Sequence, residues 1–232
     1  MLRNRLLDSL PDKYCRILQD ELEPVSLNYR RPLYQANRPI EHVYFLQTGV
    51  ASLVNTMKNG AASEVGTIGS EGFVGLPILY NDKQAPTAVY IQVPGEGFRI
   101  EAEVFRKILG ETPEILSPML HYAHAFFNQV AQSAACAHHH FLEQRCCRWL
   151  LMTRERMGSD VFLLTQEFLA MMLGVRRAGV TVVAGALQKS GLIEYRRGTI
   201  KVLDVERLKK RSCECYEVTK REFDRLLGLP GG

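Results

Sequence analysis

The sequence has no long apolar run and no evident export signal. None of its apolar segments approaches the roughly 20 residues that a membrane-spanning helix requires. The N-terminal stretch MLRNRLLDSLPDKYCRILQDEL lacks both an uninterrupted apolar core and a small-residue cleavage site, so it is unlike a signal peptide. With 232 residues, of which 46% are hydrophobic, the chain can bury a sizeable core. We therefore expect a globular cytoplasmic protein with no membrane partner.

Cysteine is too sparse and too irregularly spaced for a disulfide framework, which agrees with a reducing compartment. The six cysteines are Cys15, Cys136, Cys146, Cys147, Cys213 and Cys215. His138, His139 and His140 follow Cys136 closely, but adjacent residues on a helix point in different directions, and no Cys-x-x-Cys pair converges them. We therefore predict no metal and no cofactor. A redox role for Cys213 and Cys215 is an alternative, although no base lies nearby in the sequence.

Patterns that indicate catalysis are missing too. Ser70 stands beside Glu71 without the spacing of a nucleophile elbow, and His42 has no second histidine two residues further along its strand. We therefore predict that the protein is not an enzyme and has no catalytic residues. A barrel enzyme stays open as an alternative, and it would need a bound metal and a substrate-sized polar cavity.

Positive charge is concentrated in the C-terminal part of the chain. Residues 141–232 contain 17 Lys and Arg against 11 Asp and Glu, whereas residues 1–140 contain 12 against 14. Six basic residues and one acid, Glu194, lie between Arg176 and Lys201. This concentration indicates a polyanionic partner, and a solvated basic face is the alternative interpretation.

Short strands with frequent turns are predicted for residues 20–108. Examples are HVYFLQTG (42–49), VASLVNTM (50–57), SEVGTI (63–68) and TAVYIQV (87–93). Val, Ile, Thr, Tyr and Phe dominate these segments, and Asn59-Gly60 is a strong hairpin signal. Several short strands at this spacing predict a sandwich or barrel.

A long helix is predicted to follow, because no helix breaker occurs between Pro118 and about residue 135. Ser117-Pro118 and Thr112-Pro113 are both typical of helix starts. The apolar residues of this segment recur at spacings of three and four. They are Met119, Tyr122, Ala123, Phe126, Val130 and Ala134. This stripe either packs on the chain's own barrel or pairs with its copy in a second subunit, and periodicity alone favours neither.

The segment LLTQEFLAMMLGVRRAGVTVVAGALQKSGLI predicts two short helices joined by a tight turn. Thr165 is the expected N-cap of the first helix, and Gly174 is its expected end. The second helix has an apolar face formed by Val180, Val183, Ala184 and Leu187. This pattern is typical of a helix-turn-helix, and LIEYRRGTIKVLD (192–204) after it predicts a two-stranded ribbon that turns at Arg197-Gly198.

The opposite face of the second helix carries short, partly apolar side chains. A face that only contacts solvent typically carries Glu, Lys or Gln. Such a face can approach a DNA groove, where arginine binds guanine and small apolar groups touch thymine methyls. We predict that the DNA-contacting residues are Thr165, Gln166, Arg176, Arg177, Thr181, Lys189, Arg196 and Arg197. This small number of basic residues gives useful affinity for DNA only when a dimer supplies two half-sites.

The order of these parts resembles the CRP/FNR family of bacterial transcription regulators over residues 20–205. The resemblance implies an α+β fold with three parts: an N-terminal β-barrel of the jelly-roll, cyclic-nucleotide-binding type (residues 1–111), a long dimerisation helix and hinge (112–141), and a C-terminal winged helix-turn-helix (142–232). It implies a homodimer that binds a palindromic promoter site in double-stranded DNA, with RNA polymerase as a candidate partner. Family members of the catabolite-activator type carry Arg-Glu-Thr early in the recognition helix. Here the run is Arg177-Ala178-Gly179, so the usual target sequence cannot be carried over.

The same resemblance places an effector pocket at GSEGFVGLPILY (69–80), in a degenerate form. Its expected residues are Gly72, Gly75, Leu76, Pro77, Thr87 and Ala88. Family members that bind cyclic AMP carry a Glu for the ribose and an Arg for the phosphate, and Leu76 and Thr87 replace these groups. We therefore expect no response to cyclic AMP, and either an unknown effector or none. The family's iron–sulfur sensors need an N-terminal cysteine group, whereas this chain has Cys15 alone there.

Two other functions remain open at this point. A signalling or interaction module would keep the fold with a helix-turn-helix that no longer reads DNA. A thiol or metal redox sensor would use the cysteines. The sequence does not distinguish an activator from a repressor, because that depends on where the site lies relative to a promoter.

Overall fold

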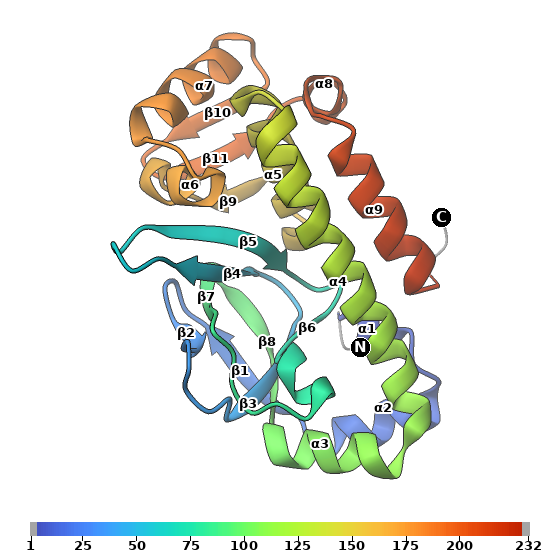
Figure 1. The fold of residues 1–232 in the computed structure, drawn as a ribbon. Helices are drawn as coiled ribbons and strands as arrows, with labels where there is room; N and C mark the ends of the chain where they lie inside the picture. Colours follow the sequence, from blue (N-terminus) through green and yellow to red (C-terminus); the bar gives the residue numbers. More distant parts are fainter. Residues whose placement is uncertain (1–3, 229–232) are drawn as a thin grey trace.

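A computed structural model describes residues 4–228 (Figure 1). Two short helices open the chain, α1 (Arg5–Asp8) and α2 (Asp12–Gln19). Asn4 caps α1 through its own side chain, and its amide nitrogen donates to the carbonyls of Leu46 and Gly72 at 2.8 Å. These bonds attach the start of the described chain to the β-domain.

The β-domain consists of two four-stranded antiparallel sheets. One has the order β1 (Glu23–Leu27), β8 (Gly95–Glu101), β3 (His42–Leu46) and β6 (Phe73–Val74). The other has the order β2 (Pro32–Tyr34), β7 (Ala88–Val93), β4 (Val50–Thr56) and β5 (Ala62–Ile68). The turn between β4 and β5 contains Asn59-Gly60, as the sequence predicts, and Gly60 has a φ of 82°.

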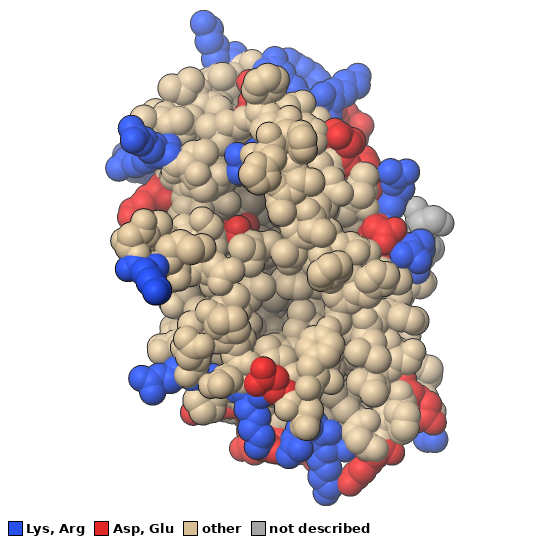
Figure 2. All heavy atoms as spheres, in the orientation of Figure 1, with Lys and Arg blue, Asp and Glu red and all other residues tan. Residues whose placement is uncertain are grey.

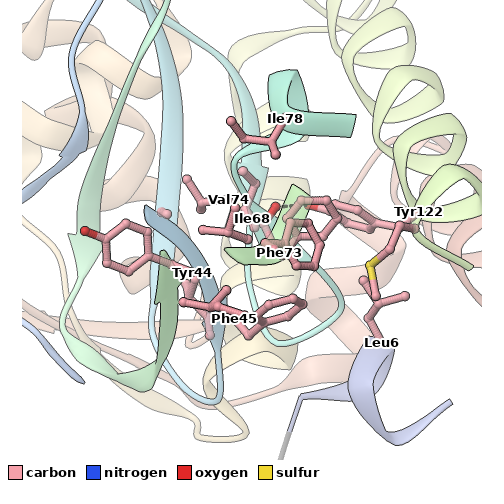
Figure 3. Close-up of a cluster of buried hydrophobic side chains, with 14 of the residues drawn as sticks. Leu6, Tyr44, Phe45, Ile68, Phe73, Val74, Ile78 and Tyr122 are labelled. Atoms are coloured by element: carbon pink, nitrogen blue, oxygen red, sulfur yellow. Dashed lines mark hydrogen bonds between the residues drawn. The ribbon is translucent and has the colours of Figure 1, made fainter. Parts of the chain in front are cut away.

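Aromatic residues fill the space between this domain and the helices (Figure 3). Phe45, Phe73 and Phe105 are fully buried and lie with ring centroids 5.6–5.9 Å apart. Tyr122 packs against Phe73 at 5.2 Å and donates its hydroxyl to the Phe73 carbonyl at 3.2 Å. The long helix is therefore part of the barrel's own core.

Two helices follow the barrel, α3 (Ala102–Glu111) and α4 (Pro113–His139). A short 3₁₀ helix, η1 (Leu76–Tyr80), follows β6 and contacts both of them. The helix α4 begins at Pro113, the earlier of the two predicted helix starts, so Pro118 lies inside it. It also continues to His139, so it has 27 residues.

The C-terminal domain begins with α5 (Leu142–Met157) and continues with β9 (Val161–Leu163), α6 (Gln166–Leu173) and α7 (Arg177–Lys189). A small sheet with the order β10-β11-β9 completes it, with β10 at Ile193–Arg196 and β11 at Thr199–Val202. The ribbon turns at Arg197-Gly198 as predicted, with φ of 50° and 78°. The prediction of two strands was incomplete, because β9 pairs with β11 as a third strand.

The chain then returns along α4 through α8 (Val205–Arg211) and α9 (Cys215–Leu226) (Figure 1). Phe223 of α9 packs against Tyr122 of α4 with ring centroids 6.3 Å apart. The Asn128 amide donates to Glu222 at 3.0 Å, one turn further along the pair. The helix α9 therefore covers one side of α4.

Among the described residues, no single helix has the length and apolar composition of a membrane span. The adjoining helices α6 and α7 meet that criterion only when they are counted together, and they are bent by 108° relative to each other.

Candidate nucleic-acid interface

The helices α6 and α7 are delimited by local signals. The Thr165 hydroxyl accepts the Phe168 amide at 3.2 Å, which satisfies one of the free N–H groups at the start of α6. The helix ends at Gly174, whose φ of 63° is the left-handed conformation that favours glycine. Both boundaries agree with the prediction, and the bend of 108° between the helices falls in the range of helix-turn-helix units.

The two faces of α7 differ in burial. Val180, Ala184 and Leu187 are buried against the rest of the domain, and Val183 is partly buried beside them. On the other face, Val182 is 71% exposed, which is unusual for a branched apolar side chain. Gly185 has open space around it, so no packing within the chain requires its lack of a side chain. The outer face of α7 is thus small, partly apolar and free.

The predicted DNA-contacting residues lie on the surface of this unit. Thr181 donates its hydroxyl to Gln166 at 2.8 Å, which connects α7 to the start of α6. Six of the other predicted residues are exposed: Thr165, Arg176, Arg177, Lys189, Arg196 and Arg197. Figure 2 shows Lys and Arg side chains projecting from the end of the molecule that carries α7. Their roles at DNA stay predictions.

Two domain families match this chain. The Crp-like helix-turn-helix domain matches residues 144–211. The cyclic nucleotide-binding domain matches residues 24–112. The chain belongs to the CRP/FNR family. It is a DNA-binding transcription regulator of the CRP/FNR type, and such regulators are non-enzymatic, as the sequence predicts.

Solved structures of CRP/FNR regulators share this fold. A regulator of the family from Eubacterium rectale is 18% identical, with 89% of this chain and 96% of that chain covered and a TM-score of 0.67. The c-di-GMP responsive global regulator CLP of Xanthomonas campestris is 16% identical, with 84% and 100% covered and a TM-score of 0.67. A Thermus thermophilus CRP/FNR regulator is 22% identical, with 82% and 98% covered and a TM-score of 0.65. No curated protein matches the sequence significantly.

The cyclic nucleotide-binding domain of this CRP/FNR regulator contains a cavity of about 260 Å³ at the predicted effector position. Gly75, Leu76, Pro77 and Thr87 line it, together with Tyr34 and other residues. No arginine or lysine is among the described residues that line it. A cyclic phosphate would therefore find no guanidinium among these residues, and the carboxylate among them is that of Asp82 and not of a glutamate.

Two of the predicted pocket residues lie elsewhere. Ala88 is buried within β7 and does not line the cavity. Gly72 lies against α4, because a Cβ atom there would come within 1.8 Å of the Tyr122 ring. Gly69 lies against α5 in the same way, since a Cβ atom added there would come within 2.4 Å of the Arg156 side chain. These two glycines allow the helices to approach the barrel and do not shape an anion site.

The stripe predicted as a dimer interface requires a correction. Met119, Tyr122, Ala123 and Phe126 are at most 5% exposed within the single chain. Met119, Tyr122 and Phe126 belong to the core that α4 shares with the β-domain, and Tyr122 also packs against α9. Val130 is partly buried with them, and Ala134 alone is exposed. The stripe therefore belongs mainly to the intrachain core, which was one of the two interpretations.

A different face of α4 is exposed. Leu120 is 41% and Phe127 is 67% exposed, and the exposed residues His124, Ala131 and Ala134 continue the same row. These five positions alternate in steps of four and three, which is the spacing of a coiled-coil seam. We call them the α4 seam. The apolar stripe predicted from the sequence shares only Ala134 with this row, because His124 interrupts the apolar spacing.

A carboxylate lies between the two domains. Glu64 of β5 accepts from the Ser52 hydroxyl at 2.6 Å and from the Trp149 indole of α5 at 3.3 Å. Burial raises the pKa of Glu64 to about 7, and these two hydrogen bonds and the nearby Arg156 and Arg148 lower it by less. The contact between barrel and helix-turn-helix domain therefore includes a group that titrates near neutral pH.

The structure also brings together side chains that the sequence analysis kept apart. Cys136 and His140 of the α4 end lie beside Cys213 and Cys215, with all four ligand atoms within 4.8 Å of one another. The prediction that these side chains do not come together was wrong, because it considered only residues that are close in the sequence. His138 and His139 are exposed and take no part, and Cys146 and Cys147 are buried in the core of the C-terminal domain.

Proposed function

We propose that this protein is a cytoplasmic homodimeric regulator whose two α7 helices read a palindromic promoter site. The observation that supports this most is the outer face of α7, where Arg177, Thr181 and Val182 are exposed on a helix that ends in Lys189. An arginine near the start of such a helix can bind guanine O6 and N7, and a small apolar side chain can touch a thymine methyl.

The remaining predicted residues have positioning roles in this proposal. Arg196 and Arg197 at the wing turn reach phosphates, as does Arg176 at the N-cap of α7. Thr165 and Gln166 at the start of α6 offer the helix N-terminus to a phosphate. Such contacts set orientation and carry no sequence information, so base discrimination falls to α7.

We propose that dimerisation uses the α4 seam in place of the buried stripe. Two copies related by a two-fold axis would bury Leu120 and Phe127 of each chain between parallel α4 helices. Small residues at Ala131 and Ala134 would allow close approach further along. The dimer then presents two half-sites, and RNA polymerase remains a candidate partner at the promoter.

We propose further that the barrel does not respond to cyclic AMP. Its cavity is largely apolar at Leu76, Pro77 and Tyr34, so a small ligand with little charge suits it better than a nucleotide. We propose the domain division 1–111, 112–141 and 142–232, in which the cavity belongs to the first two parts and the DNA interface to the third.

The experiment that tests the function is selection of bound fragments from genomic DNA at a stated salt concentration. We expect enrichment of a palindromic site whose half-sites are one helical turn, about 34 Å, or a multiple of it apart. Fragments without a shared sequence would favour the alternative of an interaction module with a helix-turn-helix that does not read DNA.

A further inference from the structure

Four potential ligands from two distant segments meet at the joint between α4 and α5. Cys136 lies in the last turn of α4 and His140 is its C-cap, whereas Cys213 lies between α8 and α9 and Cys215 is the first residue of α9. The Sγ atoms of Cys136 and Cys213 are 3.5 Å apart, and the Cys215 Sγ is 3.6 Å from His140 Nδ1. The three thiols are at most 4% exposed and the His140 side chain is 16% exposed, so bulk water has little access to the cluster.

The two shortest of these separations are close to the edges of a tetrahedron around one metal ion. With zinc bonds of about 2.3 Å to sulfur and about 2.0 Å to nitrogen, tetrahedral geometry places two sulfurs roughly 3.8 Å apart and a sulfur and a nitrogen roughly 3.5 Å apart. The distances of 3.5 and 3.6 Å are close to these values. A cluster of several irons would hold its thiolates farther apart.

The surroundings of the four residues have the features of a metal site. The Nε2 atom of His140 lies 3.2 Å from the Glu214 carboxylate, which leaves Nδ1 free to face the thiols. A carboxylate that accepts from the second ring nitrogen is the usual partner of a metal-binding histidine. The Gln132 amide donates to the Cys215 sulfur at 3.0 Å.

We propose that Cys136, His140, Cys213 and Cys215 bind one zinc ion in a closed tetrahedral site. Three cysteines and one histidine are a common ligand set of structural zinc, and no position is left for a substrate. The three thiols lose their protons on binding, so zinc with three thiolates and a neutral imidazole has a net charge of −1. Arg148 compensates this charge: its guanidinium approaches Cys136 and is held by the Ser133 hydroxyl at 2.6 Å.

The ion joins the end of α4 to the segment that leads from α8 into α9. His140 is the C-cap of α4, and Phe141 directly after it is the N-cap of α5. A zinc ion there fixes α9 on α4 and restricts the joint that orients the helix-turn-helix domain. The site is independent of DNA binding and of the barrel cavity, so its test does not depend on either.

The test measures metal in the purified full-length protein. We expect one zinc per chain by inductively coupled plasma mass spectrometry after expression with added zinc and purification under reducing conditions without chelator. The Cys213→Ser and His140→Ala variants should retain less than a tenth of this zinc. The Glu214→Gln variant should keep the ion with roughly 10- to 100-fold weaker affinity in competition with a chromophoric chelator.

Matched controls and a direct titration separate loss of the site from loss of the fold. Cys15→Ser and His139→Ala change a cysteine and a histidine outside the cluster, so both should keep one zinc per chain. Wild-type protein stripped of metal and titrated anaerobically with Co²⁺ should develop the intense visible bands of tetrahedral thiolate coordination, with an end point of one ion per chain.

Several results would overturn the proposal. Absence of stoichiometric zinc together with absence of the tetrahedral Co²⁺ spectrum would exclude the site. Recovery of iron with acid-labile sulfide would replace a single ion by a cluster. A Cys136–Cys213 disulfide in the protein, with no metal bound after its reduction, would identify a redox pair in place of a metal site.

Discussion

The guanidinium of Arg156 in α5 donates through Nε to the Glu71 carboxylate at 2.8 Å, and both side chains are buried where the helix-turn-helix domain meets the barrel. Arg156 also donates to the Thr67 hydroxyl at 2.6 Å and to the Gln129 side chain at 2.8 Å. One residue of the DNA-binding half is thus bonded to two barrel residues and to α4. Glu71 belongs to the segment GSEGFVGLPILY (69–80), so this segment contacts the C-terminal domain through the Glu71 carboxylate.

Removal of Arg156 should strongly destabilise the fold. Arg156→Ala leaves the Glu71 carboxylate buried without its partner, which typically costs about 3–5 kcal/mol. The measurement is urea unfolding at neutral pH. Arg154→Ala is the matched control, because the pair that Arg154 forms with Asp160 is partly exposed and should contribute less than about 1 kcal/mol. Equal losses in the two variants would contradict the account of this contact.

The stability of the protein should depend on pH through Glu64. Its pKa is raised from 4.5 to about 7 by burial, so the folded protein holds this proton more tightly than the unfolded chain does. The resulting stability is fully present below about pH 4.5 and is lost as the pH rises through about 7. We expect this group to lower the free energy of unfolding by roughly 1–3 kcal/mol across that window.

The Glu64→Gln variant isolates this contribution. The amide does not titrate, so its urea-unfolding free energy should vary less between pH 4.5 and 7 than that of the wild type. Glu21→Gln, at an exposed position before β1, should keep the wild-type slope. A Glu64→Gln variant with an unchanged slope would rule out this residue as the source.

The oligomeric state should depend on the α4 seam. Phe127→Asp places a charge where two chains would bury an aromatic ring, so the dimer should weaken by about 100-fold or more. Sedimentation equilibrium measures the effect. Met57→Asp is the control, because Met57 is 56% exposed at the β4–β5 turn, far from α4. A dimer of unchanged affinity in the Phe127 variant would move the interface to another surface.

Cyclic nucleotides should not bind the barrel. The cavity offers apolar groups at Leu76 and Pro77 and has no cation among the described residues that line it. Isothermal titration with cyclic AMP and with cyclic GMP should give no binding with a dissociation constant below about 1 mM, which is about −4 kcal/mol. Tight binding of either nucleotide would overturn this description of the pocket.

The helix-turn-helix could be predicted from the sequence because its signals are local. The Thr165 cap, the Gly174 terminator and the apolar spacing of α7 all lie within 25 residues, and each has a direct physical meaning. The hairpin at Asn59-Gly60 was predicted for the same reason. The strand β9 was missed because it has three residues, which are too few to show the alternating apolar pattern of a strand.

Other features depend on contacts between distant residues. The stripe on α4 predicts that something covers it, but periodicity does not say whether a barrel, α9 or a second chain does. Cys136 and Cys213 are 77 residues apart, and they meet only because α9 runs back along α4. Gly69 and Gly72 lie in the segment predicted to form the effector pocket, whereas their neighbours are Arg156 and Tyr122.

Base reading by Arg177 is the central claim, and binding affinity on defined DNA tests it most directly. Fluorescence anisotropy at one stated salt concentration compares wild type, Arg177→Ala and a control in α3, Lys107→Ala. Each protein is measured on the selected site and on each single base-pair change of it. We predict that Arg177→Ala loses about 1–3 kcal/mol and relaxes discrimination at one base pair of each half-site, while Lys107→Ala matches the wild type. A uniform loss of affinity on every sequence would contradict the claim.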